Sequence, residues 1–398
     1  MSALSTSPTP PTPSTSPPPS PSSLPLSSLL TVIITTSPIR SNPSLTLLES
    51  IIATFPYAAP LQTCSKIIVC DGYKKKDAQE GKHVKYANEK SQMRSGIVDD
   101  AQEGNYAEYK KQLKQRCVDD ADDQALPFHN TRILDLPTRH GYGFALKASL
   151  SLVETPYVIV IQHDRNFMRS TPVEEAVRVM EVDPTVKYVG MCMRSNLMYL
   201  EQFVGKYGRP MLDDLDREVK RPRELELEGG KYGGSEAAEG VFRDYHRVRD
   251  KYRLIRDNYR VSVPYVKYVR DNDGRNDGRC QASLIPTVFW YDNVHVCRTE
   301  HYRNWVFDAG RKLVKRGGFV EDKLSPRIVE DVRREGFREG WGKYGCYLLD
   351  DHAGVAFTGH MDGGAWMTED MRRERKGGWL EQNEGKAKKE EKEEGLEK

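Results

Sequence analysis

Acidic side chains in this sequence follow stretches that have the pattern of buried strands. Asp71 follows the apolar run KIIVC, Asp164 comes just after YVIVI, and Glu321 and Asp322 are adjacent in GGFVEDK. A carboxylate at the end of a buried strand can bind a hard divalent cation, and paired carboxylates can raise one another's pKa and so take part in proton transfer. Plainer explanations stay open, because Asp-Gly forms turns and acidic residues begin helices.

Alternating strand and helix signals surround these residues. Short β-branched runs, typical of buried parallel strands, occur in LLTVIITTS, KIIVCDG, TRILDLP, YVIVI and KYVGMCM. Helix signals lie between them, from Asn42-Pro43, in YGFALKASLSLV and from Thr171. The alternation predicts an α/β fold with a Rossmann-like, doubly wound mixed sheet. Ligands of such sheets bind beyond the carboxyl ends of the strands, where the acidic residues are expected.

The composition predicts a single domain between two tails. Residues 1–27 are almost wholly Ser, Thr and Pro and predict a disordered tail. Residues 28–370 form the expected folded domain, with polar insertions at about 74–127 and 200–280. Residues 371–398 form a second, charged tail.

Charge and cysteine content exclude several classes of protein. Lys plus Arg is 60 and Asp plus Glu is 58, so the net charge of +2 gives no argument for nucleic acid or an anionic membrane as partner. Arg and Tyr interleave within 200–280, but the aspartates among them favour a solvated surface over single-stranded nucleic-acid binding. The seven cysteines are scattered, which indicates reduced core residues rather than a zinc site or a disulfide framework.

No segment of the sequence approaches the roughly 20 apolar residues that span a bilayer, and the N-terminus lacks the pattern of a signal peptide. A cytoplasmic protein is therefore expected, and the Golgi or secretory pathway stays open if the N-terminus is incomplete. Phosphate-loop, dinucleotide-binding, nucleophile-elbow and zinc-protease motifs are absent from the sequence.

The order of the elements and the residues at the strand ends resemble the GT-A fold, and within it the inverting family 2 glycosyltransferases. The sequence VIITTSPIR resembles the family's opening strand and turn, Cys70-Asp71-Gly72-Tyr73 its second strand end, and RHGYGFALKASLSL its Gly-rich turn and helix. Gln162-His163-Asp164 stands at the Asp-x-Asp motif, and GGFVEDK at the later Glu-Asp. The match covers roughly 30–196 and 285–365 and departs at Gln162, which replaces the first Asp.

The resemblance implies transfer of a sugar from a nucleotide-diphosphate sugar to a carbohydrate or other hydroxyl acceptor, with inversion. Mn²⁺ or Mg²⁺ would offset the charge on the leaving nucleoside diphosphate, with Asp164 and His360 as the metal ligands. Asp322 is expected to be the general base, in preference to its neighbour Glu321. The resemblance also implies a set of donor-binding residues: Thr36, Arg40, Asp71, Lys147, Gln162 and His163.

Two other functions stay open at this point. A sugar-phosphate nucleotidyltransferase shares the nucleotide-binding sheet, but its Gly-rich loop is missing from TTSPIRSNPS. A catalytically inactive, glycosyltransferase-like binding module would account for Gln162 in place of Asp. Solvent exposure is the simpler role for Lys147, and a lone histidine such as His360 is more often structural.

Overall fold

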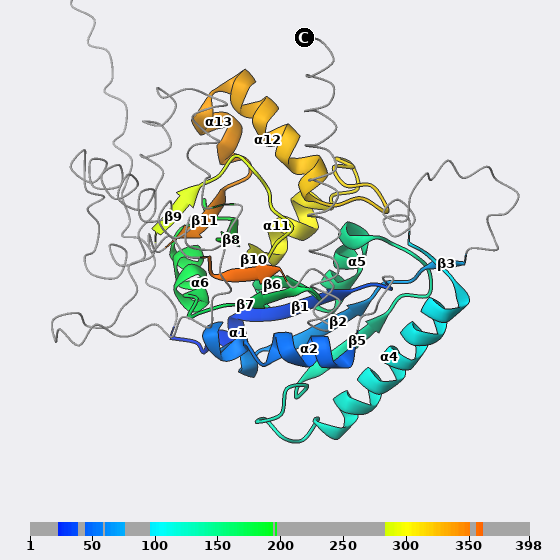
Figure 1. Cartoon of the computed structure of the whole chain (residues 1–398). Coiled ribbons are helices and arrows are strands. Elements are labelled where there is room, and N and C mark those ends of the chain that lie inside the picture. Colours follow the sequence, from blue (N-terminus) through cyan, green and yellow to red (C-terminus); the bar gives the residue numbers. More distant parts are fainter. Residues whose placement is uncertain are drawn as a thin grey trace, which may run out of the picture.

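A mixed β-sheet lies at the centre of the fold (Figure 1). The computed structural model describes residues 23–38, 44–58, 60–75, 96–193, 196, 283–350 and 356–360. Within these residues the sheet has eight strands in the order β5-β2-β1-β6-β10-β8-β11-β9. Their bounds are β1 Leu30–Thr36, β2 Ser65–Cys70, β5 Thr131–Asp135, β6 Tyr157–Gln162, β8 Tyr188–Met191, β9 Ser283–Pro286, β10 His295–Arg298 and β11 Cys346–Asp350.

Strand direction divides the sheet into two parts. β5, β2, β1 and β6 are parallel neighbours. β10 runs antiparallel to both β6 and β8, β11 is parallel to β8, and β9 is antiparallel to β11. β1 and β2 are buried almost throughout, as their β-branched sequences predict, whereas the edge strand β5 is only partly buried. This arrangement is the Rossmann-like, GT-A-like doubly wound mixed sheet that the sequence predicts.

Helices cover both faces of the sheet. Figure 1 shows α5 (Tyr142–Ser149) and α12 (Glu321–Glu335) on one face and α2 (Leu45–Ile52) on the other. α2 begins at Ser44, whose Oγ accepts the N–H of Leu47, and it buries its apolar side chains against the core. Asn42-Pro43, the expected helix start, lies outside the described residues. The other α-helices within the described residues are α1 Leu26–Leu29, α4 Asp100–Asp119, α6 Val173–Val182, α11 Thr299–His301 and α13 Phe337–Gly342.

α4 is the crossover between β2 and β5, so part of the polar stretch 74–127 belongs to the sheet architecture. A reciprocal capping box between Asp99 and Gln102 begins the helix. Tyr106, Tyr109 and Leu113 are its buried residues, on an otherwise polar helix. The sequence YAEYKKQLKQR correctly indicates this helix, and the structure extends it in both directions.

The acidic pair Glu321-Asp322 forms the first turn of α12. The open alternative that these acidic residues begin a helix is therefore confirmed, and Pro326 lies inside the helix. Gly336, at φ +83°, separates α12 from α13, a backbone conformation that glycine adopts without strain.

Two small ribbons flank the main sheet. β3 (Lys74–Lys75) pairs with β4 (Ile97–Val98), and β7 (Arg165–Phe167) pairs with β12 (Thr358–His360). Short 3₁₀ turns cover Phe55–Ala58, Leu61–Thr63 and Leu150–Leu152, and a π-helical turn covers Tyr302–Val306.

The six cysteines within the described part of the chain are free thiols, five of them buried, as the sequence predicts. None of the described helices is long and apolar enough to cross a bilayer. Arg40, the whole stretch 200–280 and the tails before Ser23 and after His360 lie outside the described residues, so the expectations that concern them stay predictions.

Candidate active site at the strand ends

Strand register brings the predicted site residues to one edge of the sheet. Thr36 pairs with Cys70, the residue before Asp71, and Thr35 pairs with Gln162. The carboxyl ends of β2, β1 and β6 therefore lie side by side, as expected for the ligand-binding edge of such a sheet.

Asp71 is buried at the end of β2 and organises the loop before α5. Its Oδ1 and Oδ2 accept the N–H groups of His140 and Gly141, each at 2.8 Å. Burial raises the pKa of this carboxyl group, and the two backbone N–H groups partly offset that effect. Both oxygens thus hold the loop, so the geometry favours a structural role over the predicted contact with the donor base.

Two other residues that the sequence predicts to bind the sugar donor also have surroundings that indicate no ligand contact. The Thr36 hydroxyl is buried and donates to the Val69 carbonyl at 2.9 Å, within the sheet. Lys147 is exposed, with its ammonium group 5.4 Å from the centre of the Phe144 ring. It lies about 7.5 Å along α5 from the first residue of that helix, which is the end at the sheet edge.

The turn between β6 and β7 carries Gln162, His163 and Asp164. Gln162 Nε2 donates to the carbonyl of Asp292 at 2.6 Å. The His163 N–H donates to the Thr35 carbonyl at 3.1 Å, which fixes the turn against β1. Asp164 Oδ1 lies 3.9 Å from the guanidinium Nε of Arg165, and both side chains are mostly buried. The turn therefore presents a carboxylate and a cation together at the sheet edge.

The β7–β12 ribbon places His360 beside this turn. His360 pairs with Arg165 in the antiparallel register, one residue from Asp164. The two predicted metal ligands, far apart in sequence, are thereby neighbours along the ribbon. The side chain of His360 lies outside the described part of the structure, so the register gives only its backbone position.

The donor types at this position fit a divalent cation that also binds phosphate. A carboxylate and an imidazole suit Mn²⁺, and Mg²⁺ usually takes only one or two carboxylates, completing its shell with substrate phosphates and water. Within the described residues no group of three or more His, Cys, Asp or Glu side chains could hold a metal by itself. A metal here would thus depend on Asp164, the position of His360 and a phosphate-bearing ligand.

A glycine loop joins this edge to the start of α12. Gly141 has φ +76°, and a Cβ on it would lie 2.5 Å from the Cα of Gly317. The Gly317 N–H donates to the His140 carbonyl at 2.7 Å, and the Gly143 N–H to the Gly318 carbonyl at 3.1 Å. The loop before Glu321 is therefore packed backbone to backbone on the loop that Asp71 organises.

Asp292, in the segment between β9 and β10, contacts the first residue of α12. The Asp292 N–H donates to Glu321 Oε2 and the Glu321 N–H donates to Asp292 Oδ2, both at 3.0 Å. Asp292 is 4 % exposed, and burial raises its pKa well above the ordinary carboxyl value. Sequence reasoning missed this residue; its only local signal was an aspartate in the apolar, aromatic run FWYDNVHV.

The two acidic residues at the start of α12 have different surroundings. Glu321 is half-buried, and burial raises the pKa of its carboxyl group, with the Asp292 N–H opposing that shift. Asp322 is exposed. The structure therefore brings Glu321, rather than the sequence-favoured Asp322, together with Asp292 and Gln162.

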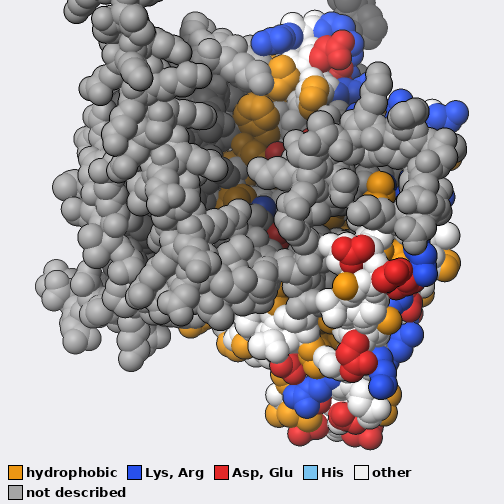
Figure 2. Space-filling model, turned by 45° about the vertical axis from the view of Figure 1, so that its right-hand side comes forward, with side chains coloured by type: hydrophobic (Ala, Val, Ile, Leu, Met, Phe, Trp, Pro, Cys, Tyr) orange, Lys and Arg blue, Asp and Glu red, His pale blue; other side chains and the backbone are white. Residues whose placement is uncertain are grey.

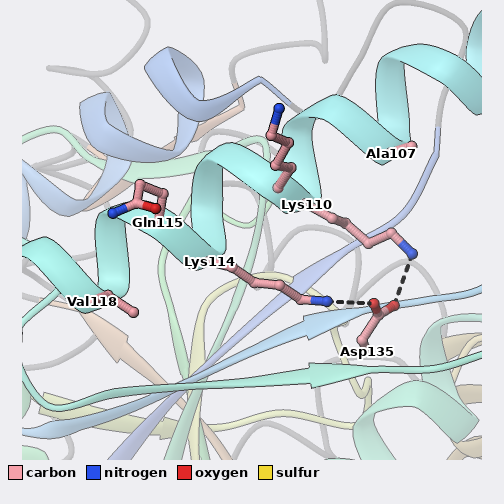
Figure 3. A pocket seen from close by; sticks show the side chains of 7 residues that line it. Ala107, Lys110, Lys114, Gln115, Val118 and Asp135 are labelled. Atoms are coloured by element: carbon pink, nitrogen blue, oxygen red, sulfur yellow. Dashed lines mark hydrogen bonds and ion pairs between the residues drawn. The ribbon is translucent and has the colours of Figure 1, made fainter.

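A separate surface groove lies between α4 and the edge strand β5 (Figure 3). Lys110 and Lys114 both reach Asp135, with Nζ–Oδ distances of 2.9 and 3.3 Å. These two ammonium groups are already paired, so the groove offers a weak attraction for a diphosphate. At the bottom of Figure 2, where α4 ends, Lys and Arg are interspersed with Asp and Glu, and no basic patch forms there.

No protein-family model and no curated protein matches the chain. Solved structures match parts of it with low similarity. The mannosyltransferase PcManGT from Pyrobaculum calidifontis, in complex with GDP-Man and Mn²⁺, has 14 % identity and a TM-score of 0.25, over 43 % of this chain and 37 % of that chain.

Two further matches have similar limits. TarS from S. aureus, in complex with UDP-GlcNAc, has 14 % identity and a TM-score of 0.24, over 42 % of this chain and 34 % of that chain. GalNAc-T7, with UDP, GalNAc and Mn²⁺, has 9 % identity and a TM-score of 0.33, over 83 % of this chain and 43 % of that chain. The chain thus spans less than half the length of each of these three proteins.

Proposed function

We propose that the chain is a glycosyltransferase that moves a sugar from a nucleotide-diphosphate sugar to a hydroxyl acceptor, with inversion and with the help of Mn²⁺ or Mg²⁺. One observation carries the proposal. Gln162 donates to Asp292, and Asp292 exchanges two hydrogen bonds with Glu321. The turn expected to face the donor diphosphate is thus joined, through a single residue, to the carboxylates expected to face the acceptor.

Glu321 is the residue of the acidic pair that we assign as general base. In the transfer, the acceptor oxygen attacks the anomeric carbon from the face opposite the diphosphate. The new C–O bond forms as the bond to the diphosphate oxygen breaks, the nucleoside diphosphate leaves with that electron pair, and the acceptor proton goes to the Glu321 carboxylate. A half-buried carboxylate with a raised pKa suits this role, because a base works best when its pKa approaches the working pH.

The β6–β7 turn is assigned to the donor diphosphate. Arg165 supplies a fixed positive charge there, and His163 and Gln162 lie at the same edge. A bound divalent cation, held by Asp164 and the His360 position, would stabilise the negative charge of the leaving group. Arg40 and Lys147 stay in the proposal as peripheral phosphate contacts.

A binding module without catalysis is the second candidate. The replacement of the family's first Asp by Gln162 favours it, since the Gln162 amide is engaged with Asp292 rather than offered as a metal ligand. In that case the same edge would bind a nucleotide sugar and leave its glycosidic bond intact.

A two-step experiment tests these proposals. Melting temperatures would be measured with GDP-mannose, UDP-N-acetylglucosamine and the corresponding diphosphates, each with and without Mn²⁺, because a bound ligand raises apparent stability. Hydrolysis of whichever donor binds is then followed over time. Metal-dependent stabilisation with turnover supports the transferase, and stabilisation without turnover supports the binding module. No stabilisation by any nucleotide would remove both.

A further inference from the structure

Asp292 is the point where three elements meet. Its carbonyl accepts from Gln162 at the end of β6, its N–H donates to Glu321 Oε2, and its Oδ2 accepts the N–H at the start of α12. Every one of these contacts orients Glu321 or the turn that follows β6. A residue whose backbone and side chain both face one partner fixes that partner's rotamer as well as its position.

The two carboxyl groups share a confined space. Asp292 is buried and, among the described residues, has no cation within ion-pair distance, whereas Glu321 is half-buried and feels the charge of Arg165. Burial disfavours the charged form of Asp292, and the negative charge of Glu321 adds to this effect, while the backbone N–H groups of Val320 and Glu321 oppose it. Burial assigns the proton to Asp292 and leaves the negative charge on the more accessible Glu321.

Other titratable groups face the pair from every side. They are Asp322 on α12, Arg165 on β7, Tyr142 on α5, Tyr188 on β8, Tyr291 and Tyr302. Burial raises the pKa of each of these tyrosines, so they stay neutral around pH 7. Asp322 adds a further negative charge, which strengthens the case for a proton on Asp292.

We propose that Asp292 is a positioning residue for Glu321: it fixes the Glu321 side chain through reciprocal hydrogen bonds and, as a neutral acid, keeps Glu321 as the single carboxylate of the pair. The inference rests on the proposed function for the role of Glu321. Its statement about the proton rests on the burial of Asp292 and on its contacts, and it can be tested without any substrate.

The first measurement is the pH dependence of unfolding by urea for the full chain and for Asp292→Asn. Asn keeps the shape, still accepts the Glu321 N–H and cannot ionise. The unfolded wild type releases the Asp292 proton above a carboxyl pKa of about 4, whereas the folded wild type retains it. The equilibrium constant for folding therefore falls about tenfold for each pH unit as the pH rises above that value. Asp292→Asn should lose this component, and the control Asp308→Asn, another carboxylate that accepts a backbone N–H, should keep it. Parallel curves for the wild type and Asp292→Asn would overturn the proposal.

An infrared spectrum of the wild type at pH 7 gives the same information if Asp292→Asn fails to fold. The proposal requires a carboxylic-acid carbonyl band that persists at this pH, and its absence would contradict a protonated Asp292.

The second measurement is the pH profile of donor turnover. The wild type should lose activity on the alkaline side as Asp292 ionises, and Asp292→Asn should retain activity there. Asp292→Ala should lower kcat at least tenfold with little change in KM, because Glu321 is no longer oriented. If donor turnover fell identically with rising pH in the wild type and in Asp292→Asn, Asp292 would have only a structural role. If the wild type turns over neither GDP-mannose nor UDP-N-acetylglucosamine, the transferase proposal fails for these donors, while the unfolding curves still decide whether Asp292 holds a proton.

Discussion

The carboxylate of Asp71 accepts the backbone N–H of Gly141 at 2.8 Å, and through this bond the end of β2 fixes the start of α5. Gly141 in turn packs on Gly317, four residues before Glu321. A strand-end aspartate thus contributes to the site by shaping a loop. The same residue looks like a ligand for the donor base when only its place after KIIVC is considered.

Asp71→Ala should therefore reduce stability more than it reduces nucleotide affinity. The substitution leaves the N–H groups of His140, which is part-buried, and Gly141, which is buried, without their charged acceptor, and hydrogen bonds to charged groups contribute about 1.5 to 3 kcal/mol each. We expect the free energy of unfolding to fall by about 3 kcal/mol, measured by urea denaturation at pH 7. Asp135→Ala, at the end of the neighbouring strand, removes only partly exposed ion pairs and should cost less than about 1 kcal/mol. Unchanged stability together with lost nucleoside binding would restore the role predicted from the sequence.

Asp164→Ala should weaken binding of a nucleoside diphosphate in the presence of Mn²⁺ and leave metal-free binding nearly unchanged. The expected loss is about tenfold or more, since removing one charged ligand costs more than about 1.4 kcal/mol. Titration calorimetry with GDP and UDP, with and without Mn²⁺, measures it. His360→Ala should act in the same direction, and Asp122→Ala, on an exposed turn, serves as the control. Equal metal dependence in Asp164→Ala and the control would remove Asp164 as a ligand.

The buried histidine His301 should make the fold sensitive to acid. Its ring stacks on Trp305 with 4.9 Å between centroids, and burial lowers its pKa to about 3. The unfolded chain takes up a proton at this residue below about pH 6.5 and the folded chain does not, so stability falls as the pH drops from 6.5 toward 3. This side chain alone contributes a slope of about 1.4 kcal/mol per pH unit.

His301→Phe keeps an aromatic ring against Trp305 and removes the titratable group. Its free energy of unfolding between pH 6 and 4 should fall less steeply than that of the wild type by about that slope. The variant Glu300→Gln changes an exposed neighbour and should follow the wild-type curve. If the free energy of unfolding of His301→Phe fell as steeply with decreasing pH as that of the wild type, the wild-type imidazole would have to be protonated in the folded state as well.

Five strands of the main sheet, β1, β2, β5, β6 and β8, could be predicted from local apolar runs, whereas β9, β10 and β11 were not predicted, because SLIP, HVCR and CYLLD are short and have few β-branched residues. The direction of β10 could not be predicted either, because HVCR is equally apolar in a parallel or an antiparallel pair. Its partners β6 and β8 lie across long stretches of chain. The polar stretch before β5 resembles an insertion in sequence because α4 buries only three of its side chains.

The residues of the candidate site could likewise be predicted only in part from the sequence. Position after a strand predicts that the ends of β1, β2 and β6 lie together, and the register has this arrangement, with Thr35 opposite Gln162 and Thr36 opposite Cys70. The choice between Glu321 and Asp322 depends on Asp292, which is 29 residues from Glu321 and carries no motif. Which of two adjacent acids is buried is a property of the packed loop, and no spacing in the sequence encodes it.

Glu321→Gln and Asp322→Asn separate these two residues directly. Gln keeps the size of the side chain and can still accept the Asp292 N–H, but it cannot take the acceptor proton. If Glu321 is the base, donor affinity and melting temperature should survive in Glu321→Gln, while kcat for transfer falls by roughly 10² to 10⁴, the usual contribution of general-base catalysis. Asp322→Asn should lower kcat less than tenfold, because the side chain is exposed, whereas Glu321 is half-buried and bonded to Asp292. Transfer with donor in excess, compared with donor affinity from calorimetry, distinguishes chemistry from binding. The reverse order of effects would assign the base to Asp322, as the family position predicts. Equal turnover in both variants would move the base elsewhere at the strand ends and leave Glu321 as a helix-start residue.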